Sequence, residues 1–268
     1  MTNTEKASPL RVIQLTDPHL MADPSGALLG VNTRDSLDAV ITLALKDPVT
    51  PDLLLATGDL AQDGSEEAYR VFADKLKAFN CPSVWLPGNH DHGPVLRQVI
   101  AGTDHGRRQV IAGGWQFIQL DTSVPGKVYG ELSAEELEFL SASLSVHPQL
   151  PALVNLHHHP VDIGCEWMAE IGLRNREAFW QVIDRFSHVK VVLWGHIHQE
   201  FDALRHDVRL LATPSTCIQF KSGARKFSVE EKAPGYRWFD LHRSGDFETG
   251  VCRADDFEYD LDCNSTGY

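Results

Sequence analysis

The stretch SVWLPGNHD, residues 83–91, is an apolar run followed directly by polar residues. The apolar part predicts a buried strand, and the loop after it begins with Asn89, His90 and Asp91. An amide and an imidazole at the end of a buried strand are potential metal ligands, and a charged neighbour follows them. The stretch therefore predicts a strand that carries functional groups at its carboxyl end.

The same arrangement recurs along the chain. Apolar runs that end in Gly, Asp, Asn or His occupy residues 11–17, 52–59, 115–121, 151–158 and 190–196. Helix signals lie between some of these runs. Thr33 is expected to cap a helix that extends to about Lys46, and Ser65 a helix that extends to Phe79. Ser133 and Glu136 form a capping box for a third helix to Leu144, and a fourth helix is expected over about 175–186. Three later strands, at 208–214, 236–242 and 248–254, have no helices between them. This order favours an α/β fold of two packed mixed β-sheets flanked by helices.

Length and composition indicate an ordinary globular protein. The chain has 268 residues, of which 43% are hydrophobic and 23% charged, with no repeat or linker, so we expect one domain over 1–268. The acidic tail from about residue 255 is expected either to pack on the outside or to be mobile.

Charge and cysteine content narrow the class of protein further. The net charge of −13 argues against broad binding of nucleic acid. The start MTNTEKASPL lacks the apolar region of a secretory signal, and no apolar run approaches the length of a membrane helix. Five cysteines without a CxxC pair suit reduced thiols. We therefore expect a cytoplasmic protein without membrane association.

Residue types that bind metals gather at the predicted strand ends. They are Asp17, His19, Asp59, Asn89, His90, His157, His158, His159, His196 and His198. Carboxyl ends of strands in an α/β sheet converge on one crevice, so we expect one site. Carboxylate, amide and imidazole donors without thiolate suit Fe, Mn, Zn or Co. Because the candidates are too many for one ion, a pair of ions sharing a carboxylate is predicted.

The ordered blocks D-x-H, G-D, G-N-H-D, H and G-H-x-H, between residues 17 and 198, resemble the calcineurin-like metallophosphoesterases. Within that family the sequence is similar to the bacterial class III 3′,5′-cyclic nucleotide phosphodiesterases. The stretches that carry this likeness are 28–37, 156–165, 195–200, 212–220 and 233–241. The resemblance implies a β-sandwich flanked by helices, which agrees with the pattern of strands and helices above.

The resemblance also implies a ligand set. One metal would be held by Asp17, His19 and His198, the second by Asn89, His196 and one histidine of the triplet, with Asp59 between them. The family places its triplet ligand two residues before a proline, so Pro160 selects His158. Strand alternation puts Val154, Leu156 and His158 on one face without saying which face looks at the metals. His157 is left as a supporting hydrogen-bond partner, and His159 as a residue of the entrance; a purely structural role is open for both.

The implied reaction is hydrolysis of 3′,5′-cyclic AMP to 5′-AMP by attack of a metal-bound hydroxide. His90 would donate a proton to the leaving oxygen, and Asp91 would either orient His90 or serve as a cap. Substrate contacts are expected from His19, Asp59, Asn89, His90 and His198. The two metals are expected to be iron or manganese, with zinc or cobalt as alternatives.

Other functions are also compatible with the sequence. A broad or glycerophosphodiester phosphodiesterase is the main alternative, and a scaffold without catalysis is a remote one. Protein phosphatases are disfavoured because GDLAQDG, residues 58–64, lacks their arginine, and purple acid phosphatases because Gln62 replaces their tyrosine. Trp167, Met168 and Asn32 are candidates for base recognition. The metal pair, the preference among cyclic nucleotides and the choice between monomer and homodimer are left undecided.

Overall fold

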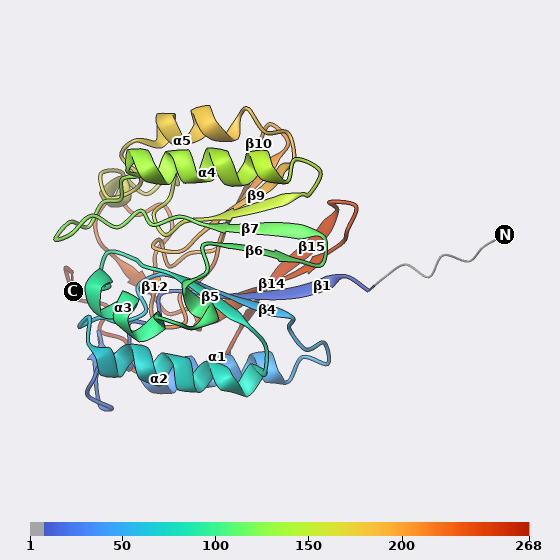
Figure 1. Cartoon of the computed structure of the whole chain (residues 1–268). Helices are drawn as coiled ribbons and strands as arrows, with labels where there is room; N and C mark the ends of the chain where they lie inside the picture. The colour runs from blue at the N-terminus through green and yellow to red at the C-terminus, as the bar shows by residue number, and fades with distance from the viewer. Residues whose placement is uncertain (1–7, 268) are drawn as a thin grey trace.

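The computed structural model describes residues 8–267 and contains two large sheets that face each other, with helices on the outer sides (Figure 1). The five-stranded sheet has the order β15 (Phe247–Arg253), β14 (Gly235–Leu241), β1 (Leu10–Leu15), β4 (Leu53–Thr57) and β5 (Ser83–Leu86). β1, β4 and β5 are parallel, whereas β14 runs antiparallel to β1 and β15. The three parallel strands therefore end at the same edge.

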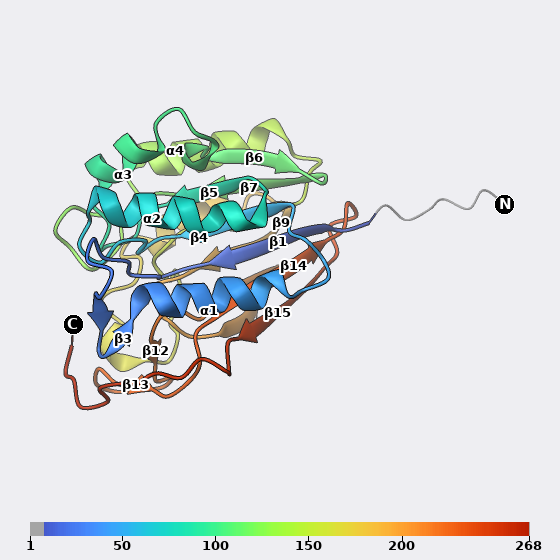
Figure 2. The ribbon, with the colours of Figure 1, turned by 90° about the horizontal axis from the view of Figure 1, so that it is seen from below.

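Three helices cover the outer face of this sheet: α1 (Thr33–Leu45), α2 (Glu66–Leu76) and α3 (Gly93–Ile100). Figure 2 shows α1 and α2 lying side by side across it. Leu37 of α1, Phe72 of α2 and Leu96 of α3 are buried in one cluster with Ile13 of β1. A short 3-10 turn, η1 (Lys77–Phe79), continues α2 to the residue where the sequence predicts the helix to end.

The six-stranded sheet has the order β10 (Phe201–Arg205), β11 (Val208–Ala212), β9 (Val189–Trp194), β8 (Ala152–Asn155), β7 (Trp115–Gln119) and β6 (Gln109–Ala112). Its four central strands are parallel. α4 (Ala134–Val146) and α5 (Arg176–Ile183) cover its outer face. Two short pairs, β2 (Ala27–Leu28) with β3 (Val31–Asn32) and β12 (Gln219–Phe220) with β13 (Val229–Glu230), and the turns η2 (Asp104–Gly106) and η3 (Glu166–Met168) complete the described elements.

The central strands are buried on both faces. In β1, Val12 packs in the cluster between the sheets with Leu55, Leu153 and Phe239, while Ile13 packs under the helices. Strands buried on both faces need apolar side chains at successive positions. This explains why the sequence shows continuous apolar runs in place of strict alternation.

The predicted fold class is confirmed, and each apolar run named above contains a strand. The sequence missed β6, β10 and α3. One helix start is corrected: Asn32, not Thr33, caps α1, because its side chain accepts hydrogen bonds from the N–H groups of Arg34 and Asp35. This capping role occupies the Asn32 oxygen that was considered for base recognition. No helix within residues 8–267 has the length and apolar character needed to cross a membrane.

The segment after β15 packs on the outside of the fold. Phe257, Tyr259 and Leu261 lie partly buried against the core, and the Asp262 N–H donates to the Leu29 carbonyl at 2.9 Å. Of the two alternatives for the tail, packing on the outside is the one observed for residues 255–267.

Candidate metal centre

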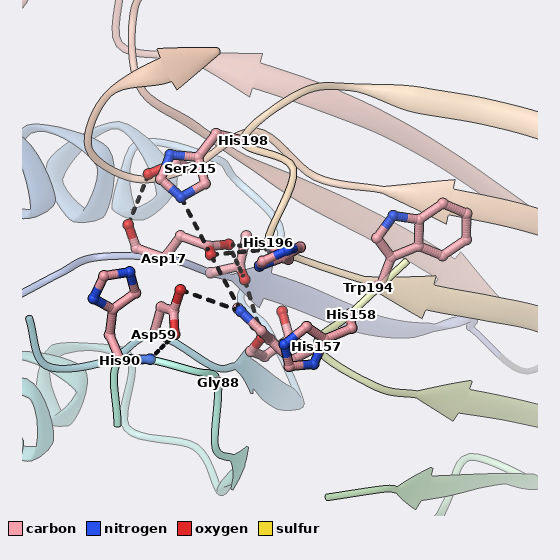
Figure 3. A network of polar contacts seen from close by, with 12 residues as sticks. Asp17, Asp59, Gly88, His90, His157, His158, Trp194, His196, His198 and Ser215 are labelled. Carbon is pink, nitrogen blue, oxygen red and sulfur yellow. Dashed lines mark hydrogen bonds and ion pairs between the residues drawn. The ribbon is translucent and has the colours of Figure 1, made fainter. Parts of the chain in front are cut away.

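The predicted ligands lie in the loops that follow the parallel strands of both sheets. Loops after β1, β4 and β5 of the first sheet carry Asp17, His19, Asp59, Asn89 and His90, and loops after β8 and β9 of the second carry the histidine triplet, His196 and His198. Figure 3 shows Asp17, Asp59, His90, His157, His196 and His198 converging on one space, whereas Trp194 points away from it. The structure thus brings together side chains that are up to 181 positions apart in the numbering, from 17 to 198.

The ligand loops have an unusual backbone. Asp17, His19, Asp59, His196 and His198 all have positive φ, between 46° and 64°. This left-handed region is costly for residues other than glycine, and such residues cluster at functional sites where the surrounding structure holds them. The conformation folds each loop back sharply, so that its side chain turns toward the shared space.

Glycines next to the ligands allow close packing. A Cβ on Gly88 would lie 2.2 Å from Asp59 Oδ1 and 2.7 Å from His157 Nε2, and one on Gly195 would lie 2.1 Å from Thr16 Oγ1. These distances are far below van der Waals contact. The Cβ on Gly195 would also lie 2.6 Å from Asp17 Oδ2, so the glycines of the G-N-H-D and G-H-I-H blocks are required by the space that the candidate ligands occupy.

The first group consists of Asp17, His19 and His198. The two imidazoles place their Nε2 atoms 3.1 Å apart, and His198 Nε2 lies 3.3 Å from Asp17 Oδ1. His19 Nδ1 lies 2.6 Å from Gln62 Oε1, and His198 Nδ1 lies 3.0 Å from the Ile218 carbonyl oxygen. Amide and carbonyl oxygens only accept, so both rings donate from Nδ1 and present the Nε2 lone pair. Two lone pairs facing each other beside a carboxylate fit a cation.

The second group consists of Asn89, His157 and His196, and the buried atoms Asn89 Oδ1 and His196 Nε2 have no hydrogen-bond partner within residues 8–267. The His157 Nδ1–H donates to the Thr57 carbonyl at 2.8 Å, which leaves Nε2 unprotonated in the neutral ring. Asp59 lies between the two groups, because Asp59 Oδ2 is 3.2 Å from His157 Nε2 and 3.9 Å from His19 Nε2. Buried polar atoms without partners are costly, and a bound cation would satisfy both Asn89 Oδ1 and His196 Nε2.

His158 has different contacts from His157. Its Nδ1 lies 2.7 Å from Thr122 Oγ1, and its Nε2 lies 3.1 Å from the Val128 carbonyl oxygen, so Nε2 must donate. The ring is buried and also lies against Gly130, where a Cβ would come within 2.4 Å of it. One ring nitrogen of His158 lies within 4.8 Å of a ring nitrogen of His157 and of one of His196. Of the two neighbouring rings, however, only His157 directs a nitrogen at the carboxylate of Asp59, whereas both nitrogens of His158 are taken up by Thr122 and Val128.

His159 is buried beside His196. Its ring stacks against His196 with centroids 5.7 Å apart, and a Cβ on Gly172 would lie 2.6 Å from its Nε2. It does not belong to the residues that line the pocket beside the ligands. The contacts of His159 therefore give no support to a place at the substrate entrance.

His90 borders that pocket together with Asp59, Asn89 and His196. The His90 backbone N–H donates to Asp59 Oδ1 at 2.8 Å, and its ring lies 5.0 Å from the ring of His19. The carboxylate of Asp59 thus anchors the backbone of His90, and the ring of His90 lies beside the first group.

Asp91 joins two loops. Its carboxylate accepts hydrogen bonds from the backbone N–H groups of Leu60, Ala61 and Gly88, at 3.2, 3.0 and 2.8 Å. Burial and the charge of Asp59 raise the pKa of Asp91 to about 7. Of the two roles considered for Asp91, these contacts match a capping role: it connects the loop after β4 to the loop after β5.

Burial keeps most of the imidazoles neutral. It lowers the pKa of His19 to about 3 and, together with His158, lowers the pKa of His196 far below its usual value. Burial also opposes protonation of His157, but the charges of Asp59 and Asp17 and the hydrogen bonds to Asp59 and the Thr57 carbonyl together outweigh it and raise the pKa of His157 to about 9. Burial disfavours the Asp59 carboxylate too, yet His157 and His90 lower the pKa of Asp59 well below its usual value. His19 and His196 are therefore neutral, as metal ligands must be, whereas the neighbouring carboxylates keep a proton on His157 that a bound cation would displace.

Several residues of the site carry no signal in the sequence. Gln62 orients His19, Thr57 orients His157, and Ser215 donates to the Asp17 carbonyl at 2.7 Å. Each contacts a candidate ligand at least 43 positions away in the chain, so only the folded structure reveals the contact. Gln62 was noted in the sequence only as a departure from a related family.

Comparison with known proteins agrees with this geometry. Residues 10–200 match the family model described as calcineurin-like phosphoesterase. The chain is 44% identical to the 3′,5′-cyclic adenosine monophosphate phosphodiesterase CpdA of Escherichia coli K12, over 97% of this chain and 95% of that protein. It is 41% identical to the CpdA of Pseudomonas aeruginosa, over 96% and 94%.

A solved structure has the same fold. A dimetal phosphatase from Danio rerio aligns with a TM-score of 0.64 at 16% identity, covering 92% of this chain and 99% of that one. With the family match over residues 10–200 and identities above 40% over nearly the whole length, the chain belongs to the calcineurin-like phosphoesterase family.

Proposed function

We propose that this protein hydrolyses 3′,5′-cyclic AMP to 5′-AMP at a two-metal site. The observation that carries the proposal is that buried atoms of Asn89 and His196 make no hydrogen bond among the described residues, while Nε2 of the neighbouring His157 faces the carboxylate of Asp59 at 3.2 Å. The relatives named as cyclic AMP phosphodiesterases support the substrate, because their similarity extends over almost the entire chain.

Our proposed ligand set differs from the sequence expectation at one position. Asp17, His19 and His198 would hold one ion, and Asn89, His196 and His157 the other, with Asp59 shared. We place His157 in the role expected for His158, because both ring nitrogens of His158 already have protein partners. Iron or manganese ions, or alternatively zinc or cobalt, would supply Lewis acidity and lower the pKa of a bound water.

The protein side chains have separate tasks in this proposal. His90 reaches the pocket from a backbone that Asp59 fixes, which suits it to donate a proton to the 3′ oxygen as that oxygen leaves. His19, Asp59, Asn89 and His198 would contact the phosphodiester: Asp59 and Asn89 line the pocket, and His19 and His198 belong to the adjoining first group. Asp91 would keep the loops that carry Asp59 and His90 in register.

A kinetic comparison tests the proposal. Purified protein is stripped with a chelator, reconstituted with each metal in turn, and assayed on cyclic AMP, cyclic GMP, 2′,3′-cyclic AMP and glycerophosphocholine. We expect two equivalents of bound metal and the highest kcat/KM on cyclic AMP. Equal or better turnover of glycerophosphocholine would favour a broad phosphodiesterase instead. Absence of both metal and turnover, also on bis(p-nitrophenyl) phosphate, would favour a scaffold.

A further inference from the structure

A pocket of about 270 Å³ adjoins the ligand groups and has two kinds of lining. Polar residues of the metal centre form one part, and the rest is mainly apolar. The apolar lining residues are Val128, Trp167, Met168, Ile171, Phe220 and Phe227. Ionic chemistry at the phosphodiester does not need an apolar surface, so this part of the pocket requires a separate explanation.

Three of these residues form an aromatic cluster, defined as Trp167, Phe220 and Phe227. Ring centroids of Trp167 lie 5.2 Å from those of both phenylalanines, and the two phenylalanines lie 5.6 Å apart. All three pairs meet at steep angles, between 66° and 82°, which is a favourable geometry for aromatic rings. The cluster therefore supports itself, although its members come from η3, from β12 and from the loop after β12.

The aromatic cluster is joined directly to the metal centre. Phe220 stacks on His198, with centroids 4.2 Å apart and planes only 9° from parallel. A substrate bound at the group formed by Asp17, His19 and His198 would therefore have aromatic rings next to it. Thr266 and Gly267 line the same pocket from the segment after β15.

A cyclic nucleotide has the same two-part character as this pocket. Its phosphodiester is anionic, whereas its base is a flat π-system that gains from contact with aromatic rings. We propose that the aromatic cluster is the subsite for the nucleobase of the substrate. The inference rests on the proposed function and adds to it the residues that separate nucleotides from phosphodiesters without a base.

Two substrates that differ only in the base isolate this contribution. The metal-reconstituted protein is assayed on cyclic AMP and on ribose 3′,5′-cyclic phosphate, which has no base. Base stacking changes binding by roughly fivefold to a hundredfold per aromatic side chain removed. We expect Trp167→Ala and Phe227→Ala each to lower kcat/KM for cyclic AMP about tenfold and to change kcat/KM for the abasic substrate less than twofold. Trp167→Phe should restore most of the cyclic AMP activity.

Phe186→Ala is the matched control, because Phe186 is partly buried against the same hydrophobic core as Phe227 but does not line the pocket. It should leave both substrates unaffected. Phe220 is not used, since its ring stacks on His198 and its loss would disturb the metal centre.

The outcomes separate the two proposals. If Trp167→Ala and Phe227→Ala lower the activity on both substrates equally, or on neither, the base subsite is wrong while cyclic AMP hydrolysis stands. If the wild-type protein hydrolyses neither substrate, the proposed function itself fails.

Discussion

Replacing His157 and His158 one at a time should have different effects: one replacement should lower the metal content and the other the stability. The two residues are adjacent, identical in type and both buried, so they form a matched pair. His157 directs a ring nitrogen at the carboxylate of Asp59, whereas His158 uses both ring nitrogens on Thr122 and Val128. The alanine variants therefore remove different things.

For His158→Ala the loss is mainly one of stability. The buried Thr122 hydroxyl loses its partner, at about 1–3 kcal/mol, and the carbonyl of the exposed Val128 loses a hydrogen bond worth about 1 kcal/mol, so we expect the free energy of unfolding to fall by about 3 kcal/mol. At about 2–4 °C per kcal/mol, Tm should drop by about 10 °C. Both metal equivalents should stay bound after desalting.

For His157→Ala we expect one metal equivalent to be lost, because a ligand of the second group is missing. Loss of a supporting contact already lowers metal affinity about 10- to 100-fold, and loss of a ligand should exceed that. Elemental analysis of desalted protein, thermal unfolding and kcat/KM on cyclic AMP are measured together. If His158→Ala loses one equivalent and His157→Ala keeps two, the assignment is refuted and the spacing from Pro160 is the better guide. His158→Gln serves if the alanine variant does not fold.

Three further changes probe the same centre. Gly88→Ala places a Cβ 2.2 Å from Asp59 Oδ1, so atoms must move by about 1 Å and kcat/KM on cyclic AMP should fall about 100-fold. The control is Gly106→Ala, whose Cβ meets nothing closer than 3.5 Å and which should leave kcat/KM nearly unchanged. His90→Ala should lower kcat by about 10²- to 10⁴-fold with metal content unchanged by elemental analysis, and unchanged turnover would exclude the role as proton donor. Gln62→Leu removes the acceptor that fixes one ligand ring, so a metal titration should show about 10- to 100-fold weaker binding, while wild-type affinity would mean that this hydrogen bond does not matter.

Much of the architecture could be predicted because the central strands are buried on both faces. Continuous apolar runs such as 190–196 then stand out, and the residues that follow them fall at one edge of each sheet. β10 was missed for the opposite reason: it lies at the edge of its sheet, and its residues alternate between half-buried and exposed, so it contains no continuous apolar run. α3 was missed because it has only eight residues and no side-chain cap at its start, so neither length nor a capping residue marks it in the sequence.

The candidate site shows where sequence spacing reaches its limit. Asp17, His19, Asp59, Asn89, His196 and His198 could be nominated because each follows a strand. The choice within the triplet could not be made this way, because it depends on which carbonyl oxygen each ring meets. The backbone carbonyl groups of Thr57 and Val128 supply those oxygens, and the side chains of these two residues give no indication of this in the sequence.

The ligand loops come from both sheets, and this has a mechanical consequence. Asp17, Asp59 and Asn89 move with one sheet, while His157 and His196 move with the other. Any sliding of the two sheets against each other would change the spacing between the carboxylates and the imidazoles. Side chains in the layer between the sheets, such as Leu55 and Leu153, thereby set the alignment of the centre without touching it. In this fold, the packing of the apolar layer between the sheets determines the distance between the two halves of the candidate metal site.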